Sequence, residues 1–200
     1  TVEQMVRRKE FPWEISDLNQ IGSFIASNEE KAPGNAARCA LETALIDAFA
    51  RSLDMPALDL FPGRHRVPSI RYGATIPLGS PERISGFCRM INELGMDAVR
   101  LKLGPDRDSN LKALQAVRES CGPGCDLRVD INGAWKFDDF LFHLPMLRSN
   151  GVGVVEQPLA PGDRNLADAA LCAEQEGVLL MADEEACTAR QIDEIIQQGH

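Results

Sequence analysis

Several features that mark common protein classes are missing from this chain of 200 residues. No apolar run approaches the roughly 20 residues that a membrane-spanning helix needs, so we predict no membrane segment. The first ten residues, TVEQMVRRKE, lack the apolar core of a signal peptide. The six cysteines are scattered along the sequence, which is typical of reduced thiols. Together these absences lead us to expect a cytoplasmic protein.

Basic residues are scarce as well. Lysine and arginine number 21 against 30 aspartates and glutamates, which gives a formal net charge of −9. Such a chain repels phosphate backbones, so the composition argues against nucleic acid as a partner. A cation held by carboxylates suits this charge better, although the same charge also fits a surface that is acidic only for solubility.

The sequence contains neither GxGxxG nor GxxxxGK[ST], the glycine-rich loops of common nucleotide-binding folds. It contains instead a regular alternation of strand-like and helix-like segments. The strand-like segments are residues 69–76, 97–104, 126–132, 153–158 and 178–183. The helix-like segments after them are residues 81–95, 107–120, 137–150, 164–177 and 189–199. This alternation predicts an α/β fold with a parallel sheet, either doubly wound or an eight-stranded barrel of the TIM type.

Residues 35–54 carry apolar side chains at helical spacing and stop before Met55-Pro56, where a helix cannot continue. No strand-like pattern precedes them. We therefore predict a helical first domain at residues 1–66 and a second domain at 67–200 that holds the strands.

Acidic residues end three successive predicted strands. Asp130, Glu156 and Asp183 are separated by 156 − 130 = 26 and 183 − 156 = 27 residues. A single acid at a strand end usually caps a helix or forms a turn. In a parallel barrel, however, the strand ends converge on one mouth, where three carboxylates repel one another unless a cation holds them. All-oxygen ligands favour Mg²⁺, Mn²⁺ or Ca²⁺ over zinc.

Two basic residues lie on the preceding predicted strand. Arg100 and Lys102 are two residues apart, so they share a strand face and would point toward the same mouth. A lysine there could also simply cover apolar surface with its stem. Glu184 follows Asp183 and should face away from the site or support it from behind.

Four short motifs carry a resemblance to a known family. The segments RLKLG, RVDINGAW, VVEQPL and MADEE, in this order, resemble the enolase superfamily, in particular its muconate-lactonising enzyme-like subgroup (the mandelate racemase/muconate lactonising enzyme family). ALETALIDAFARSLDMP resembles the helix that precedes the barrel in that family's capping domain. The resemblance implies a TIM-type (β/α) barrel, present here in part as about five strands, preceded by helices of an α+β capping domain.

The resemblance also implies roles for individual residues. Asp130, Glu156 and Asp183 would bind Mg²⁺, with Mn²⁺ as an alternative. Lys102 would be the acid/base residue on one face of the substrate. Arg100 stands where the family usually has its first lysine, and keeps a positive charge near a substrate carboxylate.

Asn132 and Glu184 would support this set. The implied reaction is abstraction of the proton next to a carboxylate, through an enediolate intermediate. A racemase or epimerase, a cycloisomerase, and a dehydratase such as o-succinylbenzoate synthase all begin with this step.

The family's barrel has more strands than this sequence provides, so we expect a piece of a longer enzyme that is inactive alone. The expected partner is a small carboxylate, and we expect a homo-oligomer. The alternative is a non-catalytic barrel-type binding protein, against which Lys102 argues, because binding alone needs no base.

Overall fold

The computed structural model describes residues 14–28, 34–61, 63 and 69–198. The chain divides into two compact units, Thr1–Pro68 and Ser69–His200. The predicted domain boundary after residue 66 falls within residues 64–68, which lie outside the described residues. The assignment of the first unit as part of a capping domain stays a prediction.

The described part of the first unit consists of helix α2 (Leu18–Ser27), helix α3 (Asn35–Ser52) and the short 3₁₀ helix η1 (Ala57–Leu60). The carboxylate of Asp17 accepts a hydrogen bond from the N–H of Gln20 and so caps α2. Helix α3 confirms the helix predicted over residues 35–54. The core between α2 and α3 is made of Ile21, Leu41, Leu45 and Phe49.

The second unit alternates strands and helices, as predicted. Its strands are β1 (Ala74–Ile76), β2 (Ala98–Lys102), β3 (Asp126–Asp130), β4 (Val152–Glu156) and β5 (Leu179–Met181). Its helices are α4 (Pro81–Glu93), α5 (Arg107–Cys121), α6 (Phe137–Ser149), α7 (Leu166–Gln175) and α8 (Ala189–Gln198).

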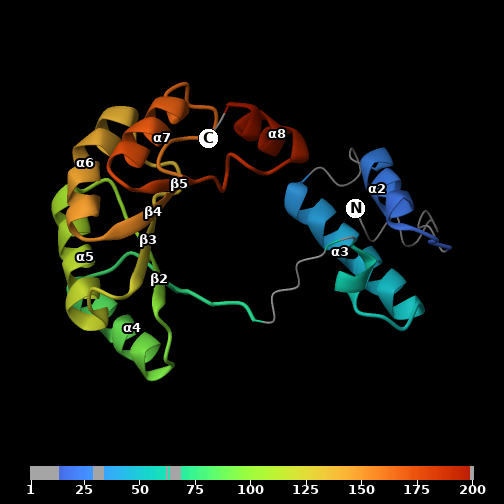
Figure 1. Ribbon diagram of the computed structural model, residues 1–200, viewed down its shortest axis with the longest axis horizontal. Helices are drawn as coiled ribbons and strands as arrows, with labels where there is room; N and C mark the ends of the chain where they lie inside the picture. The colour runs from blue at the N-terminus through green and yellow to red at the C-terminus, as the bar shows by residue number, and fades with distance from the viewer. Residues whose placement is uncertain (1–13, 29–33, 62, 64–68, 199–200) are drawn as a thin grey trace. The chain divides into compact units, whose positions relative to one another are not determined.

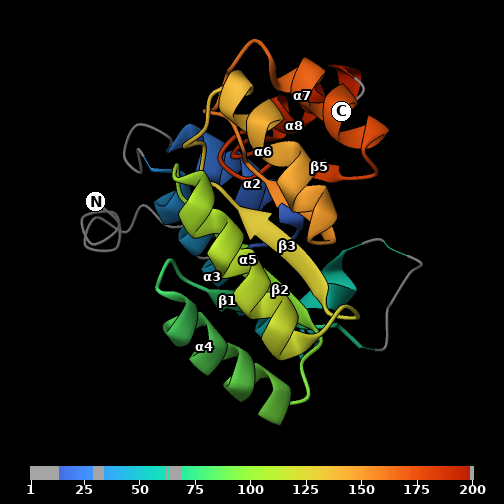
Figure 2. The same ribbon diagram turned by 90° about the vertical axis from the view of Figure 1, so that its left-hand side faces the viewer.

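The five strands form one parallel sheet in the order β1-β2-β3-β4-β5. Helices α4 to α7 cover one face of this sheet (Figures 1 and 2). A doubly wound sheet would reverse its strand order and place helices on both faces. The sequential order therefore excludes that alternative and confirms the fold of a partial α/β barrel.

Local sequence explains how the faces of the sheet differ. In β2, Val99 and Leu101 are buried in the core, whereas Arg100 and Lys102 are only half-buried.

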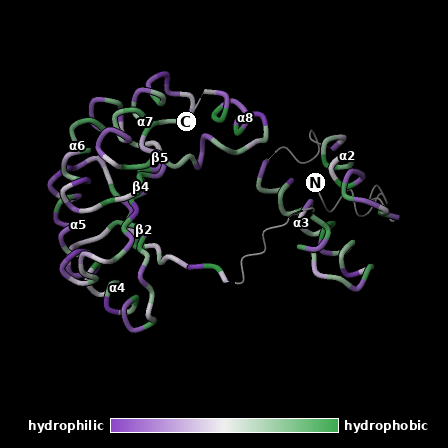
Figure 3. The backbone as a smooth tube through the Cα atoms, in the orientation of Figure 1, coloured by the Kyte–Doolittle hydropathy of each residue, from purple (hydrophilic) through white to green (hydrophobic). Residues whose placement is uncertain are grey.

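Helix α5 ends at Gly122, whose φ of 77° is accessible to glycine without strain. Figure 3 shows hydrophilic and hydrophobic residues alternating along the helices, as in amphipathic helices that cover a sheet. Within the described ranges no helix is long and apolar enough to cross a membrane.

The two edge strands are shorter than the sequence predicts. Residues 69–73 precede β1 without joining the sheet, and β5 ends at Met181. The consequence for the site is that Asp183 lies in the turn after β5 and does not end the strand itself.

Candidate active site

Three of the residues predicted for the site lie side by side at the carboxyl ends of neighbouring strands. Lys102 on β2 pairs in register with Asp130 on β3, and Asp130 pairs in register with Glu156 on β4. Because parallel strands present the same face at paired positions, these three side chains project from one edge of the sheet. The regular sequence spacing thus becomes a row of charged groups.

Asp130 is the centre of this row. It is 1% exposed, and its Oδ2 accepts a hydrogen bond from Lys102 Nζ at 2.8 Å. Its Oδ1 accepts a second hydrogen bond from the backbone N–H of Asn132 at 3.0 Å. A buried carboxylate needs such partners, since leaving a charge unpaired away from water is costly.

Arg100 lies against both buried acids. Its Nη1 donates to Glu156 Oε1 at 2.6 Å and lies 3.7 Å from Asp130 Oδ2. The hydrogen bond to Glu156 raises the pKa of the Arg100 guanidinium, and the charges of Glu156, Asp130 and Asp183 raise it further, against the opposing effect of desolvation. Arg100 is thus a fixed positive charge held among the acids.

A chain of hydrogen bonds leads from Lys102 to Glu184. Lys102 Nζ donates to Asn132 Oδ1 at 2.5 Å, and Asn132 Nδ2 donates to Glu184 Oε1 at 3.0 Å. Asn132 adopts a left-handed backbone conformation, with φ of 50°, which turns its side chain back across the strand ends. Glu184 is therefore linked to Lys102 indirectly, through the side-chain amide of Asn132.

Asp183 stands apart from this cluster. It is exposed, and its backbone N–H donates to the side chain of Gln157. In the part of the chain that the structure describes, no three acidic, histidine or cysteine side chains gather closely enough to ligate one metal ion. The structure brings Lys102, Asp130, Glu156 and Arg100 together, while Asp183 adds only its charge at the same edge.

The acidic pair is nevertheless suited to a divalent cation. Arg100 holds Oε1 of Glu156, whereas Oε2 of the same carboxylate is buried and has no hydrogen-bond partner among the described residues. A buried carboxylate oxygen without a partner is costly unless a cation satisfies it. The oxygens of Asp130, Glu156 and Asp183 are the ligand type that Mg²⁺ and Mn²⁺ prefer.

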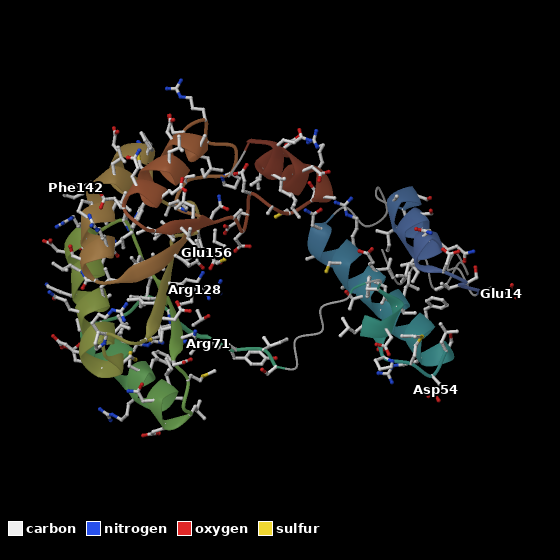
Figure 4. All side chains as sticks on the ribbon, in the orientation of Figure 1. Glu14, Asp54, Arg71, Arg128, Phe142 and Glu156 are labelled. Atoms are coloured by element: carbon white, nitrogen blue, oxygen red, sulfur yellow. The ribbon has the colours of Figure 1, made fainter. Side chains whose placement is uncertain are left out.

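Two of the site residues, Arg100 and Glu156, also line a hollow on the side of the sheet away from helices α4 to α7. The cavity has a volume of about 340 Å³ and is lined by residues that include Arg100, Glu156, Arg71 and Arg128. Figure 4 shows Glu156, Arg128 and Arg71 on this side of the sheet. The cavity lining combines these arginines with the carboxylates of Glu156 and Asp126.

Sequence reasoning missed one residue at the site. Gln157 comes directly after Glu156, is 1% exposed, and bonds to the turn that carries Asp183. The signal available in the sequence was an amide within a buried run, since an amide is buried only where hydrogen bonds satisfy it.

Comparison with known proteins identifies the same family that the four sequence motifs resemble. Residues 84–200 match the family described as Enolase C-terminal domain-like. L-Ala-D/L-Glu epimerase from Bacillus subtilis (strain 168) is 27% identical over 165 residues, which cover 81% of this chain and 44% of the epimerase. Chloromuconate cycloisomerase CbnB from Cupriavidus necator is 30% identical over 173 residues, which cover 84% of this chain and 45% of that protein. The chain therefore spans less than half the length of these relatives.

A solved structure shows the same architecture. The dipeptide epimerase from Cytophaga hutchinsonii, complexed with Mg and the dipeptide D-Ala-L-Val, matches with a TM-score of 0.78 over 92% of this chain and 50% of that chain. The two sequences are 22% identical, so this likeness concerns the fold. With a family match over more than half its residues and the predicted strand-end motifs in register, this chain belongs to the enolase C-terminal domain-like family.

Proposed function

We propose that this protein catalyses the Mg²⁺-dependent abstraction of a proton next to the carboxylate of a small substrate. The observation that carries this proposal is the row of Lys102, Asp130 and Glu156 in register across three strands. Nζ of Lys102, the candidate base, lies 2.8 Å from Oδ2 of the buried Asp130. Oε2 of Glu156, on the next strand, is buried and has no hydrogen-bond partner among the described residues.

Asp130, Glu156 and Asp183 are the residues that would hold Mg²⁺, with Mn²⁺ as an alternative. When bound, the cation would supply positive charge to the substrate carboxylate as negative charge develops on it. The three acids come from the ends of β3 and β4 and from the turn after β5. Because the three acids come from different parts of the sheet, the distances between them depend on the register of the strands.

Lys102, as the neutral amine, would take the proton onto the lone pair of Nζ. Asn132 Oδ1 and Asp130 Oδ2 both accept hydrogen bonds from Nζ, and so fix the direction in which this atom points. Arg100 contributes a fixed positive charge at the edge of the cavity, and its planar guanidinium suits a carboxylate. Loss of the proton would convert the substrate into an enediolate, whose negative charge Arg100 and a bound divalent cation would stabilise.

The similar proteins indicate how the reaction continues after proton abstraction. They include epimerases of dipeptides and chloromuconate cycloisomerases. We infer that the whole protein is an isomerase: an epimerase returns a proton to the opposite face, and a cycloisomerase closes or opens a ring from the same intermediate. A dehydratase such as o-succinylbenzoate synthase shares the first step.

Mg²⁺ binding tests this proposal. Isothermal titration calorimetry on the intact protein should show that Asp130→Asn weakens Mg²⁺ by roughly tenfold or more, because a ligand is lost. Asp126→Asn is the matched control, since Asp126 lies on the same strand and bonds to Arg128 instead. Its affinity should stay within about twofold of wild type. Equal Mg²⁺ affinity in the Asp130→Asn variant and the wild type would contradict the proposal.

A further inference from the structure

Gln157 lies where the ends of three strands meet. It comes after Glu156 at the end of β4, and its φ of 38° ends the extended conformation. Non-glycine residues at positive φ are uncommon and persist where their surroundings hold them. The side chain is 1% exposed, so its amide is almost fully removed from water.

The side-chain amide of Gln157 uses both of its ends. Oε1 accepts hydrogen bonds from the backbone N–H groups of Asp183 and Glu185, each at 3.0 Å. Nε2 donates to the backbone oxygen of Leu159 at 2.9 Å. Because both groups facing Oε1 are donors, only the oxygen of the amide satisfies them, which fixes its orientation.

The backbone of Gln157 joins the same elements. Its N–H donates to the oxygen of Met181, the last residue of β5, at 2.8 Å. Its oxygen accepts from the N–H of Gly133, in the loop after β3, at 2.7 Å. One residue therefore connects the loop after β3, the end of β4 and the turn after β5.

The side chain of Gln157 bonds to the turn that carries Asp183. Strand β5 ends at Met181, so no strand pairing reaches the N–H of Asp183. The oxygen of Gln157 accepts that hydrogen bond and the one from Glu185, as a neighbouring strand would. An apolar residue would be less costly to bury here, so the amide has to be explained by what it holds.

We propose that Gln157 is a positioning residue for metal binding: it holds the turn of residues 183–185 so that Asp183 can join Asp130 and Glu156 around the cation. This inference rests on the proposed function and goes beyond it, because Gln157 itself touches neither the metal nor the substrate. It also explains how an acid in the turn after β5 can serve a site built on the ends of β3 and β4.

The first measurement needs no metal. Amide hydrogen exchange by NMR in the intact protein should show that Gln157→Leu speeds exchange at Asp183 and Glu185 by about tenfold or more, because both lose their acceptor. Gln157→Glu keeps an acceptor oxygen, so both amides should stay protected in that variant. The Gln157→Glu variant also provides a second substitution to measure if Gln157→Leu does not fold. Gln115→Leu, on the exposed side of α5, is the matched control and should leave both amides unchanged.

The second measurement is Mg²⁺ affinity by calorimetry. Gln157→Leu should weaken Mg²⁺ by about tenfold, as loss of a residue that orients a ligand does, while Gln115→Leu should not. If the two amides exchange faster and Mg²⁺ affinity stays the same, Gln157 only packs the turn and the inference is overturned. It is also overturned if exchange does not change. If the wild type binds no Mg²⁺, both the proposed function and a role for Gln157 in metal binding are overturned. Faster exchange at Asp183 and Glu185 in Gln157→Leu would then show that Gln157 holds the turn and that the error concerns the metal.

Discussion

Replacing Arg100 with methionine tests how the buried acids are held together. Methionine keeps most of the apolar stem and removes the guanidinium, which lies 2.6 Å from Glu156 Oε1 and 3.7 Å from Asp130 Oδ2. Removing one partner of a fully buried ion pair costs about 3–5 kcal/mol. The Arg100 side chain is 38% exposed, so water screens part of this loss, and we expect about 2 kcal/mol.

Urea unfolding without divalent cations measures this loss. The second unit contains Trp135 and the sequence has one other tryptophan, Trp13, so a Trp13→Phe background makes fluorescence report on Trp135 alone. The matched control is Arg128→Met, since Arg128 is the register partner of Arg100 on the neighbouring strand. Arg128 bonds to Asp126 at 3.3 Å and its own side chain is 44% exposed, so its loss should cost less than about 1 kcal/mol.

The comparison has a clear negative outcome. If Arg100→Met lowers the free energy of unfolding by less than about 0.5 kcal/mol, or by no more than Arg128→Met does, then Arg100 does not hold the acids. The electrostatic description of the site would then be wrong even if the fold is right.

Two further predictions concern stability. Arg118 donates to the backbone oxygens of Asn150 at 2.6 Å and Gly151 at 2.7 Å, among others, so Arg118→Met should lower unfolding free energy by about 2–3 kcal/mol in the same urea assay. Unchanged stability would show that water replaces these bonds. Burial raises the pKa of the Cys88 thiol to about 12, with contributions from neighbouring cysteines. The folded state then keeps a proton that the unfolded chain releases near pH 9, so stability should fall between about pH 9 and 12. Denaturation followed over that range should show a smaller fall in Cys88→Ala, and an equal fall would contradict the assignment.

The sequence predicted the fold well because its signals were periodic. Alternating apolar strands and amphipathic helices indicate a parallel sheet from local pattern alone. Asp130 and Glu156 lie on neighbouring strands, as predicted, because the strands follow one another in the sheet in the order of the sequence. The choice between a barrel and a doubly wound sheet needed the strand order itself, which pattern does not give.

What the sequence did not predict depends on contacts between strands. Asp183 was expected to end its strand, but β5 stops two residues earlier, at Met181. The place of Arg100 between two acids depends on side-chain length and the spacing across strands, and neither is visible along one segment. Gln157 was missed for the same reason, because its partners lie 26 and 28 residues further along the chain.

Exchange of the substrate's α-proton with deuterated water, monitored by NMR, tests the central claim most directly. The assay uses the intact protein with Mg²⁺ and a dipeptide, or the lactone formed from a muconate, that wild type turns over. Lys102→Ala should bind Mg²⁺ nearly as wild type does and slow exchange by about 100-fold or more, because the base is gone. Lys112→Ala, on the exposed side of α5, should exchange the proton at the wild-type rate. If Lys102→Ala exchanges it as fast as wild type, on either stereoisomer, then Lys102 is not the base.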